Sequence, residues 1–238
     1  MERLDKYLAS RGTGSRREVQ KLIKSGAVSI DGAVCKLTDA KVRADAAVTV
    51  NGQAVGEKYV YLMLNKPAGV VSATTDKRDR TVIDLLPAAY RRRGLFPAGR
   101  LDKDTEGLLI LTNDGDFAHR MLSPKKHVGK TYVAQLDGAV TQEMRTRFAQ
   151  GIVFADGTKC LPAQLETDAE KGENTGIVTI YEGKFHQVKK MFATCGRKVV
   201  HLQRISIGNL YLDSNLPIGQ CKSLTNLEIE QIFIGNIH

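Results

Sequence analysis

The chain has 238 residues, 42% of them hydrophobic, which is enough for one sizeable core and a small additional domain. Lysine and arginine total 35 against 26 acidic residues, a net charge of +9. This excess favours a polyanionic partner such as a nucleic acid, although a basic protein with no such partner explains it equally well. No apolar run has membrane-spanning length and no apolar signal core opens the chain, so we expect a cytoplasmic protein with no membrane partner.

The four cysteines are far apart in the sequence, at Cys35, Cys160, Cys195 and Cys221. The paired spacing of a zinc site is therefore absent, and we expect no bound metal. In a reducing compartment such residues remain free thiols. We expect them to be mostly buried.

Residues 1–58 are predicted to form a separate domain. Apolar residues at i, i+3 and i+4 predict a short helix that starts near Leu4. Ser15 and Glu18 form a capping box, which predicts a second helix that ends at Gly26. Alternating apolar residues on both sides of Asp31-Gly32 then predict a hairpin.

Basic residues of the second helix project away from its apolar stripe. A charged helix face is most often solvated surface, but an arginine pair at a helix N-terminus also suits phosphate. The domain resembles S4-type RNA-binding domains, and this resemblance implies that Arg16, Arg17 and Lys21 contact an RNA backbone. The residues that carry it are Arg3-Leu4-Asp5-Lys6-Tyr7-Leu8, Ser15-Arg16-Arg17, Gly26, Val28, Asp31 and Gly32.

Residues 59–238 are predicted to form a second domain, after a polar linker over 52–58. Strands are expected over 59–64, 108–111, 131–136 and 176–181, and helices over 82–86, 141–150 and 187–195. A polar loop over 74–80 lies between the first strand and the first helix. Strands and helices alternate too irregularly for a doubly wound sheet, so the fold class is α+β.

A charged loop over 99–107 offers three interpretations. Asp102, Asp104 and Glu106 copy the start of a calcium-binding loop, but the required glutamate at its twelfth position is replaced by Asn113. The acids and glycines are also typical of a plain turn, with Arg100 paired to one carboxylate. The third interpretation is nucleophilic catalysis by a carboxylate that a neighbouring cation keeps charged and aimed. No cofactor motif accompanies the loop, so we expect no cofactor.

Five ordered segments resemble the motifs of the RsuA family of ribosomal small-subunit pseudouridine synthases. They are Gly-Arg-Leu-Asp-Lys-Asp-Thr-Glu-Gly-Leu-Leu from Gly99, Met63 to Gly69, Lys130-Thr131-Tyr132, Glu182 to Phe192, and Val199 to Gly208. The resemblance spans nearly the whole chain. It implies a catalytic domain of mixed α/β structure, built on a largely antiparallel central sheet.

The resemblance also assigns the catalytic roles. Asp102 is implied to be the catalytic aspartate, which adds to the target nucleotide while the base detaches, rotates and rejoins through carbon. Lys189 is implied to pair with Asp102, and Arg100 to help hold the flipped-out nucleotide. Tyr132 is implied to stack on the base and to act in proton removal from carbon five. Leu202 is implied to pack against the base.

Other polar residues of these motifs receive no catalytic role. His186 is expected to contact RNA or to pack, while Asp104 and Glu106 shape the loop. The Phe-His-Gln-Val-Lys-Lys-Met form of the third motif is most similar to enzymes that act on 16S ribosomal RNA. We therefore expect one uridine of that RNA as the substrate, in a partly assembled small subunit, and a monomeric enzyme. The alternatives are a uridine of the large subunit, or a non-catalytic RNA-binding factor in ribosome assembly.

Overall fold

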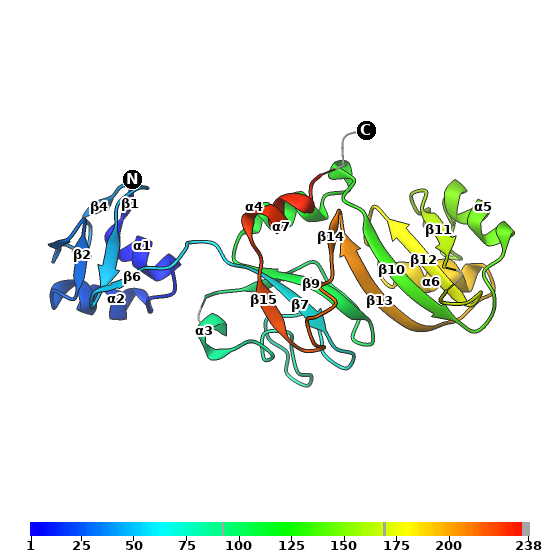
Figure 1. Cartoon of the computed structure of the whole chain (residues 1–238), viewed down its shortest axis with the longest axis horizontal. Helices are drawn as coiled ribbons and strands as arrows, with labels where there is room; N and C mark the ends of the chain where they lie inside the picture. Colours follow the sequence, from blue (N-terminus) through cyan, green and yellow to red (C-terminus); the bar gives the residue numbers. More distant parts are fainter. Residues whose placement is uncertain (92, 169, 235–238) are drawn as a thin grey trace. The chain divides into compact units, whose positions relative to one another are not determined.

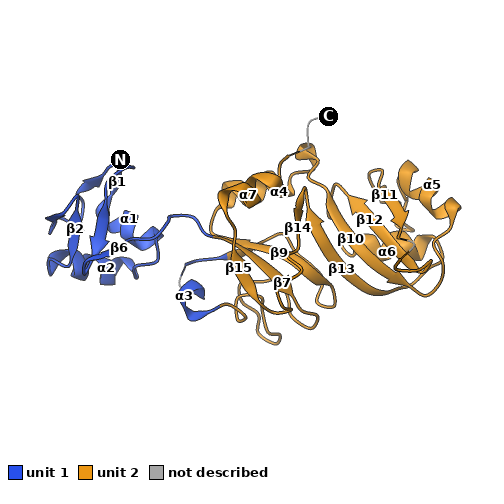
Figure 2. Cartoon of the chain, in the orientation of Figure 1, with its two compact units in different colours: residues 1–60, 87–95 blue, residues 61–86, 96–238 orange. Residues whose placement is uncertain are grey.

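The computed structural model describes residues 1–91, 93–168 and 170–234. The chain divides into two compact units (Figure 2): residues 1–60 with 87–95, and residues 61–86 with the chain from Phe96 onward. Within the described residues, no helix combines the length and the apolar character needed to cross a membrane.

The first unit packs two helices against short strands. Leu4, Leu8, Val19, Ile23 and Val28 are fully buried between them, which confirms the predicted apolar faces of both helices. The elements are β1 (Glu2–Arg3), α1 (Leu4–Ser10), α2 (Arg16–Lys24), β2 (Val28–Ile30), β3 (Ala33–Val34), β4 (Lys41–Val42), β5 (Val48–Val50) and β6 (Gln53–Ala54), with α3 (Ala88–Arg91) from the later segment.

Local sequence signals in this unit are confirmed by their hydrogen bonds. The Ser15 hydroxyl accepts from the Glu18 amide, and the Glu18 carboxylate accepts from the Ser15 amide at 2.7 Å, so the capping box is complete. Asp31 (φ 50°) and Gly32 (φ 83°) make the left-handed turn between β2 and β3. The linker predicted over 52–58 is wrong at its start, because Asn51-Gly52 forms a second such turn that pairs β6 with β5.

The second unit is built on a mixed sheet (Figure 1) with the strand order β11-β12-β10-β13-β9-β7-β15. Pairing along this order is antiparallel except between β13 and β9, which run parallel. The predicted α+β class with a largely antiparallel sheet is thereby confirmed. The strands are β7 (Tyr61–Lys66), β8 (Phe96–Ala98), β9 (Glu106–Thr112), β10 (Lys130–Leu136), β11 (Gln164–Thr167), β12 (Thr175–Ile180), β13 (Val199–Ile207), β14 (Leu210–Tyr211) and β15 (Cys221–Ser223).

Helices cover this sheet at both ends. Phe117 and Met121 of α4 are buried against the same apolar cluster as Leu108 and Ile110 of β9. The helices are α4 (Gly115–Leu122), the 3-10 turn η1 (Pro124–Lys126), α5 (Gln142–Gln150), α6 (Gln187–Thr194) and α7 (Asn226–Gln231). The predicted helices over 141–150 and 187–195 are thus found with their ends shifted by a residue.

Two predicted elements differ from the structure. The first strand of this unit runs on through Lys66 instead of stopping at Leu64. Residues 82–86 form turns rather than a helix, although the Asp84 carboxylate accepts from both the Thr81 amide and hydroxyl, a contact that favours the start of a helix. Pro87 follows directly and disfavours helical backbone at the residue before it.

The four cysteines are free. The expectation that they are mostly buried is wrong, since Cys160 alone is buried and the other three are half-buried.

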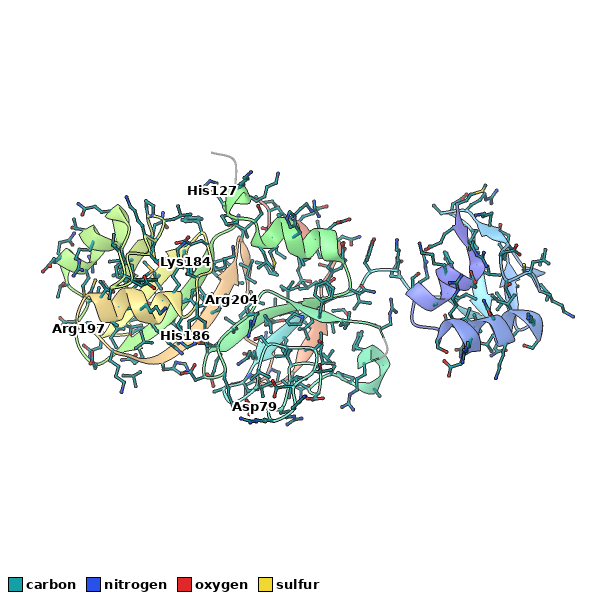
Figure 3. The ribbon with its side chains drawn as sticks, turned by 180° about the vertical axis from the view of Figure 1, so that it is seen from behind. Asp79, His127, Lys184, His186, Arg197 and Arg204 are labelled. Atoms are coloured by element: carbon teal, nitrogen blue, oxygen red, sulfur yellow. The ribbon has the colours of Figure 1, made fainter. Side chains whose placement is uncertain are left out.

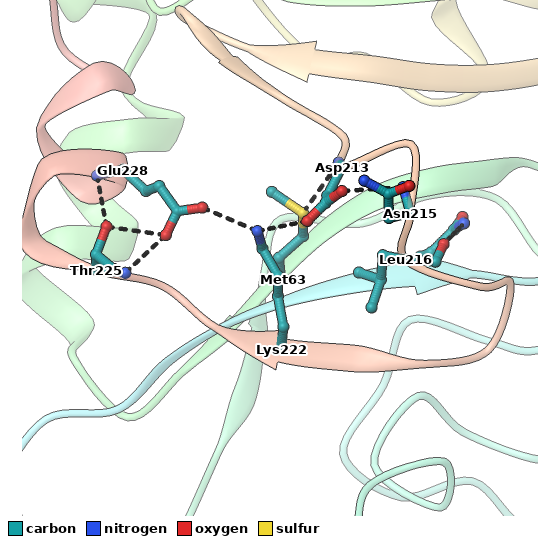
Figure 4. A network of polar contacts seen from close by, with 8 residues as sticks. Met63, Asp213, Asn215, Leu216, Lys222, Thr225 and Glu228 are labelled. Carbon is teal, nitrogen blue, oxygen red and sulfur yellow. Dashed lines mark hydrogen bonds and ion pairs between the residues drawn. The ribbon is translucent and has the colours of Figure 1, made fainter.

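A polar network fixes the C-terminal edge of the sheet (Figure 4). Lys222 of β15 pairs with Asp213 at 2.7 Å and with Glu228 of α7 at 3.0 Å. The Asp213 amide in turn donates to the sulfur of Met63 in β7 at 3.5 Å. These contacts hold β7 in place, and β7 ends next to the charged loop.

Candidate active site

The charged loop over 99–107 leads directly into β9. The Asp102 carbonyl accepts from the Thr105 amide at 3.1 Å, so the acidic residues lie on a tight turn. The Ser72 hydroxyl braces its start, donating to the Leu101 carbonyl at 2.9 Å and accepting from the Leu101 amide at 3.0 Å. The turn is therefore held by buried hydrogen bonds from a segment some thirty residues earlier in the chain.

Lys66, at the end of β7, supports the same turn from inside the core. Its side chain is fully buried, and its ammonium donates to the carbonyls of Pro67 at 2.9 Å, Lys103 at 3.3 Å and Thr105 at 2.8 Å. Burial lowers the pKa of Lys66 to about 8, and the nearby carboxylates oppose this shift. That Lys66 supports the turn was not predicted from the sequence. The signal for it was a lysine that closely follows the apolar residues of a strand.

Gly107 is the point where three strands meet. It pairs with Lys66 of β7 and, in parallel, with Arg204 of β13. Its φ is +97°, and a Cβ atom there would lie 2.3 Å from the Arg204 carbonyl oxygen. Only glycine allows β13 to approach this closely, and that approach brings the β10–β13 half of the sheet to the charged turn.

A cavity of about 80 Å³ opens at this junction. All five residues expected to act on the nucleotide line it: Arg100, Asp102, Tyr132, Lys189 and Leu202. They come from the loop, from β10, from α6 and from β13. Segments separated by up to a hundred residues thus meet around one small space.

Lys189 lies between two carboxylates. Its ammonium is 3.3 Å from Asp102 Oδ2 and 2.5 Å from Asp104 Oδ1. The hydrogen bond from Lys189 is the main reason that the pKa of Asp104 is lowered. Asp104 therefore shares the partner expected for Asp102, in addition to shaping the turn.

His186 also approaches Asp102. Its Nε2 lies 3.6 Å from Asp102 Oδ1, and it precedes α6 with left-handed backbone (φ 52°). Figure 3 shows His186 and Lys184 on the segment ahead of α6, with Arg204 on β13. The carboxylate of Asp102 thus has a histidine and a lysine on its two oxygens.

Arg100 does not make the expected ion pair. Its side chain is exposed and lines the cavity, yet within the described residues no hydrogen bond or ion pair joins it to Asp102. The Asp102 carboxylate is instead paired with Lys189, 3.3 Å from its Oδ2. Arg100 is free to meet a bound molecule.

Tyr132 and Leu202 form the apolar side of the cavity. Tyr132 is 8% exposed and Leu202 is 5% exposed. Tyr132 pairs with Arg204 across β10 and β13, and Leu202 pairs with Ala134, so both lie on one face of the sheet. A flat wall of this kind suits an aromatic base.

Arg204 lies on the same face and was missed by sequence reasoning. It is 4% exposed, donates to the Leu108 carbonyl at 2.7 Å and approaches the Tyr132 hydroxyl at 3.4 Å. The period-two alternation of β13 places Arg204 on the face of Leu202, which was the signal that could have found it. The arginine links the strand that carries Tyr132 to the strand that follows the charged turn.

Asp5 pairs with two of the basic side chains of the first unit, those of Arg3 and Arg16. This fully buried carboxylate accepts from Arg3 at 3.1 Å, Arg16 at 3.2 Å and Gln20 at 3.2 Å. The Arg3 hydrogen bond is the main reason that the pKa of Asp5 lies far below its usual range. Arg16, Arg17 and Lys21 are all exposed, and Arg16 also pairs with Asp5 at 3.2 Å.

Comparisons with known proteins identify both domains of the chain. A family model described as RNA pseudouridylate synthase matches residues 60–194, and one described as S4 domain matches residues 2–48. The chain is 49% identical to YtzG of Bacillus subtilis (strain 168), an uncharacterized RNA pseudouridine synthase, over 95% of this chain and 96% of the relative.

Relatives named for different ribosomal subunits are similarly close to this chain. The ribosomal small subunit pseudouridine synthase A of Vibrio parahaemolyticus is 41% identical, over 97% of this chain and 99% of its own. The ribosomal large subunit pseudouridine synthase B of Bacillus subtilis is 39% identical, over 98% and 96%. A crystal structure of a pseudouridylate synthase matches with a TM-score of 0.69 and 36% identity, over 98% of this chain and 100% of that one. The chain belongs to the RNA pseudouridylate synthase family and carries an S4 domain ahead of its catalytic domain.

Proposed function

We propose that this enzyme converts one uridine of 16S ribosomal RNA to pseudouridine, with Asp102 as the nucleophile. The observation that carries the proposal is the cavity in which Asp102 faces Tyr132, Leu202 and Lys189. The proposed target is the family site, uridine 516 of that RNA. The protein acts as a monomer on RNA or on a partly assembled small subunit.

The chemistry needs no group beyond the side chains in the cavity. The bond from the ribose C1′ to N1 breaks, the base rotates, and a bond from C1′ to C5 forms. C5 loses its proton and N1 gains one, so the reaction is an isomerisation. The Asp102 carboxylate adds covalently to the target nucleotide and is released again when the C1′–C5 bond has formed, while the ring packs against the wall formed by Tyr132 and Leu202.

We assign a role to each of Lys189, Tyr132 and Arg100 and to the basic residues of the S4 domain. Lys189, 3.3 Å from the carboxylate, orients it and balances its charge. Tyr132 stacks on the base and acts in the removal of the proton from C5. Arg100, exposed at the rim of the cavity, fills the place that the flipped-out base leaves in the RNA. Arg16, Arg17 and Lys21 of the S4 domain bind phosphates and give the RNA its orientation.

A tritium-release assay on unmodified 16S ribosomal RNA with labelled C5 tests the proposal. We expect wild type to release tritium and Asp102→Asn to release none above background. Asp104→Asn is the matched control, because it makes the same chemical change on the other carboxylate of Lys189. The proposal is wrong if wild type is inactive on both naked RNA and partly assembled subunits, or if both variants lose activity equally.

A large-subunit uridine is the second candidate, favoured by the 39% identity to a large-subunit synthase. Mapping pseudouridine in both ribosomal RNAs, with and without the gene, separates the two. A missing modification in the large subunit would replace the 16S assignment and leave the role of Asp102 unchanged.

A further inference from the structure

The segment ahead of α6 exposes an aromatic side chain at the edge of the cavity. Phe185 is 73% exposed. Its ring is stacked on His186, with centroids 3.8 Å apart and an interplanar angle of 20°. A single exposed apolar residue is ordinary on a protein surface, but this ring is fixed parallel to a second ring.

Buried polar residues make the segment rigid. Glu182, 7% exposed, accepts from the Leu161 amide at 2.8 Å and from the Gln187 side chain at 2.9 Å. Gln187, 4% exposed, accepts from the Lys184 amide at 2.8 Å. These hydrogen bonds hold the segment that carries Phe185 in one conformation, which lowers the entropy cost of binding a ligand to Phe185.

The stacked pair is also fixed relative to the chemistry. Lys184 and His186, the neighbours of Phe185 in the chain, both line the cavity. His186 Nε2 lies 3.6 Å from Asp102 Oδ1. Phe185 therefore stacks directly on the residue that contacts Asp102, the proposed nucleophile.

A positive charge accompanies the ring. Lys190, one turn into α6, has its ammonium 5.3 Å from the Phe185 centroid. An aromatic face beside a cation suits a nucleotide, because the base stacks while the phosphate pairs with the charge.

We propose that Phe185 and His186 form a stacking platform for the nucleobase next to the target uridine. This inference rests on the proposed function, since it takes the cavity as the site of the flipped-out uridine. When that uridine leaves the strand, its neighbour loses a stacking partner. Phe185 replaces that partner, and the platform thereby favours RNA in which the flanking base stacks well.

The test is a binding titration with a single-stranded RNA that contains one uridine, flanked on each side by 2-aminopurine. Stacking on an aromatic side chain quenches this fluorescent base. We expect wild type to quench it, and Phe185→Ala to lose the quenching and bind about tenfold more weakly, as expected for one lost base–aromatic stack. Phe185→Tyr keeps a ring and should restore both.

Tyr211→Ala is the matched control. Tyr211 is 65% exposed on β14 and does not line the cavity, so its loss should change neither quenching nor affinity. The platform is refuted if wild type gives no quenching, if Phe185→Ala behaves as wild type, or if both alanine variants weaken equally. Binding needs no turnover, so these results are independent of whether pseudouridine forms.

Discussion

The buried Lys66 gives the sharpest test of how the catalytic turn is held. Lys66→Met keeps the length of the side chain and removes the ammonium. Three carbonyls, those of Pro67, Lys103 and Thr105, then lose their donor. Two of the three belong to the turn that carries Asp102.

The size of the effect follows from two opposing terms. Hydrogen bonds from a charged group contribute about 1.5–3 kcal/mol each, so three lost bonds cost about 4–9 kcal/mol. Burying the ammonium has its own cost, because the pKa of Lys66 is lowered from 10.5 to about 8, which corresponds to about 3 kcal/mol. Methionine removes that cost. The hydrogen-bond term is larger, and the free energy of unfolding should fall by about 1–6 kcal/mol.

Urea unfolding and steady-state kinetics measure the two consequences. The unfolding midpoint should fall, while kcat should drop about a hundredfold through misplacement of Asp102 by about 1 Å. Lys130→Met is the matched control for stability. Lys130 is 5% exposed, and burial lowers its pKa to about 8, but within the described residues its ammonium has no hydrogen bond or ion pair. Its replacement should leave the protein equally stable or more stable.

Either of two results would refute the argument. If Lys66→Met unfolds at the same urea concentration as Lys130→Met, the three carbonyl contacts contribute no net stability. If Lys66→Met loses stability and keeps the wild-type kcat, the lysine supports the fold without positioning the turn.

Three further expectations follow from the contacts. Between about pH 8 and 10.5, Lys130 in the unfolded chain keeps the proton that Lys130 in the folded protein has lost, so the free energy of unfolding should rise with pH. The urea midpoint should therefore rise less steeply with pH in Lys130→Met than in wild type. Equal slopes of midpoint against pH would exclude this group. Gly107→Ala places a Cβ atom 2.3 Å from a backbone oxygen of Arg204, and should cost more than about 3 kcal/mol or prevent folding; a thermal midpoint within a few degrees of wild type would contradict the close approach. Arg17→Ala with Lys21→Ala should weaken RNA binding and lower its salt slope by about two, and an unchanged slope would exclude this helix face from the RNA contact.

Local signals in the sequence were enough for many elements. The capping box at Ser15, the turn at Asp31-Gly32 and the alternation over Thr131–Leu136 depend on neighbours within a few residues, and each is found in the structure. The helix expected over 82–86 is not found, because Pro87 disfavours helical backbone at the residue before it and outweighs a short apolar pattern.

Local sequence signals do not predict which charged side chains form ion pairs with one another. Neighbours along the chain offered Arg100 as one possible partner of a loop carboxylate, and only the family resemblance pointed to Lys189 as the partner of Asp102. The structure places Lys189 on Asp102 and adds His186. Ion pairs depend on a few ångströms in space, and neither partner lies near Asp102 in the sequence.

By itself, the sequence determined the chemical groups and their order: the carboxylates of the loop, the tyrosine and lysine that follow them, and the two domains. The tertiary structure alone decided that Gly107 lets β13 reach β9, that Lys66 supports the turn from inside the core, and that Lys189 serves two carboxylates. The reason is physical. Residue types are fixed by the covalent sequence, but the cavity forms only after strands that are far apart in the chain have packed together. Where β13 approaches Gly107 of β9, this packing leaves no room for an additional atom.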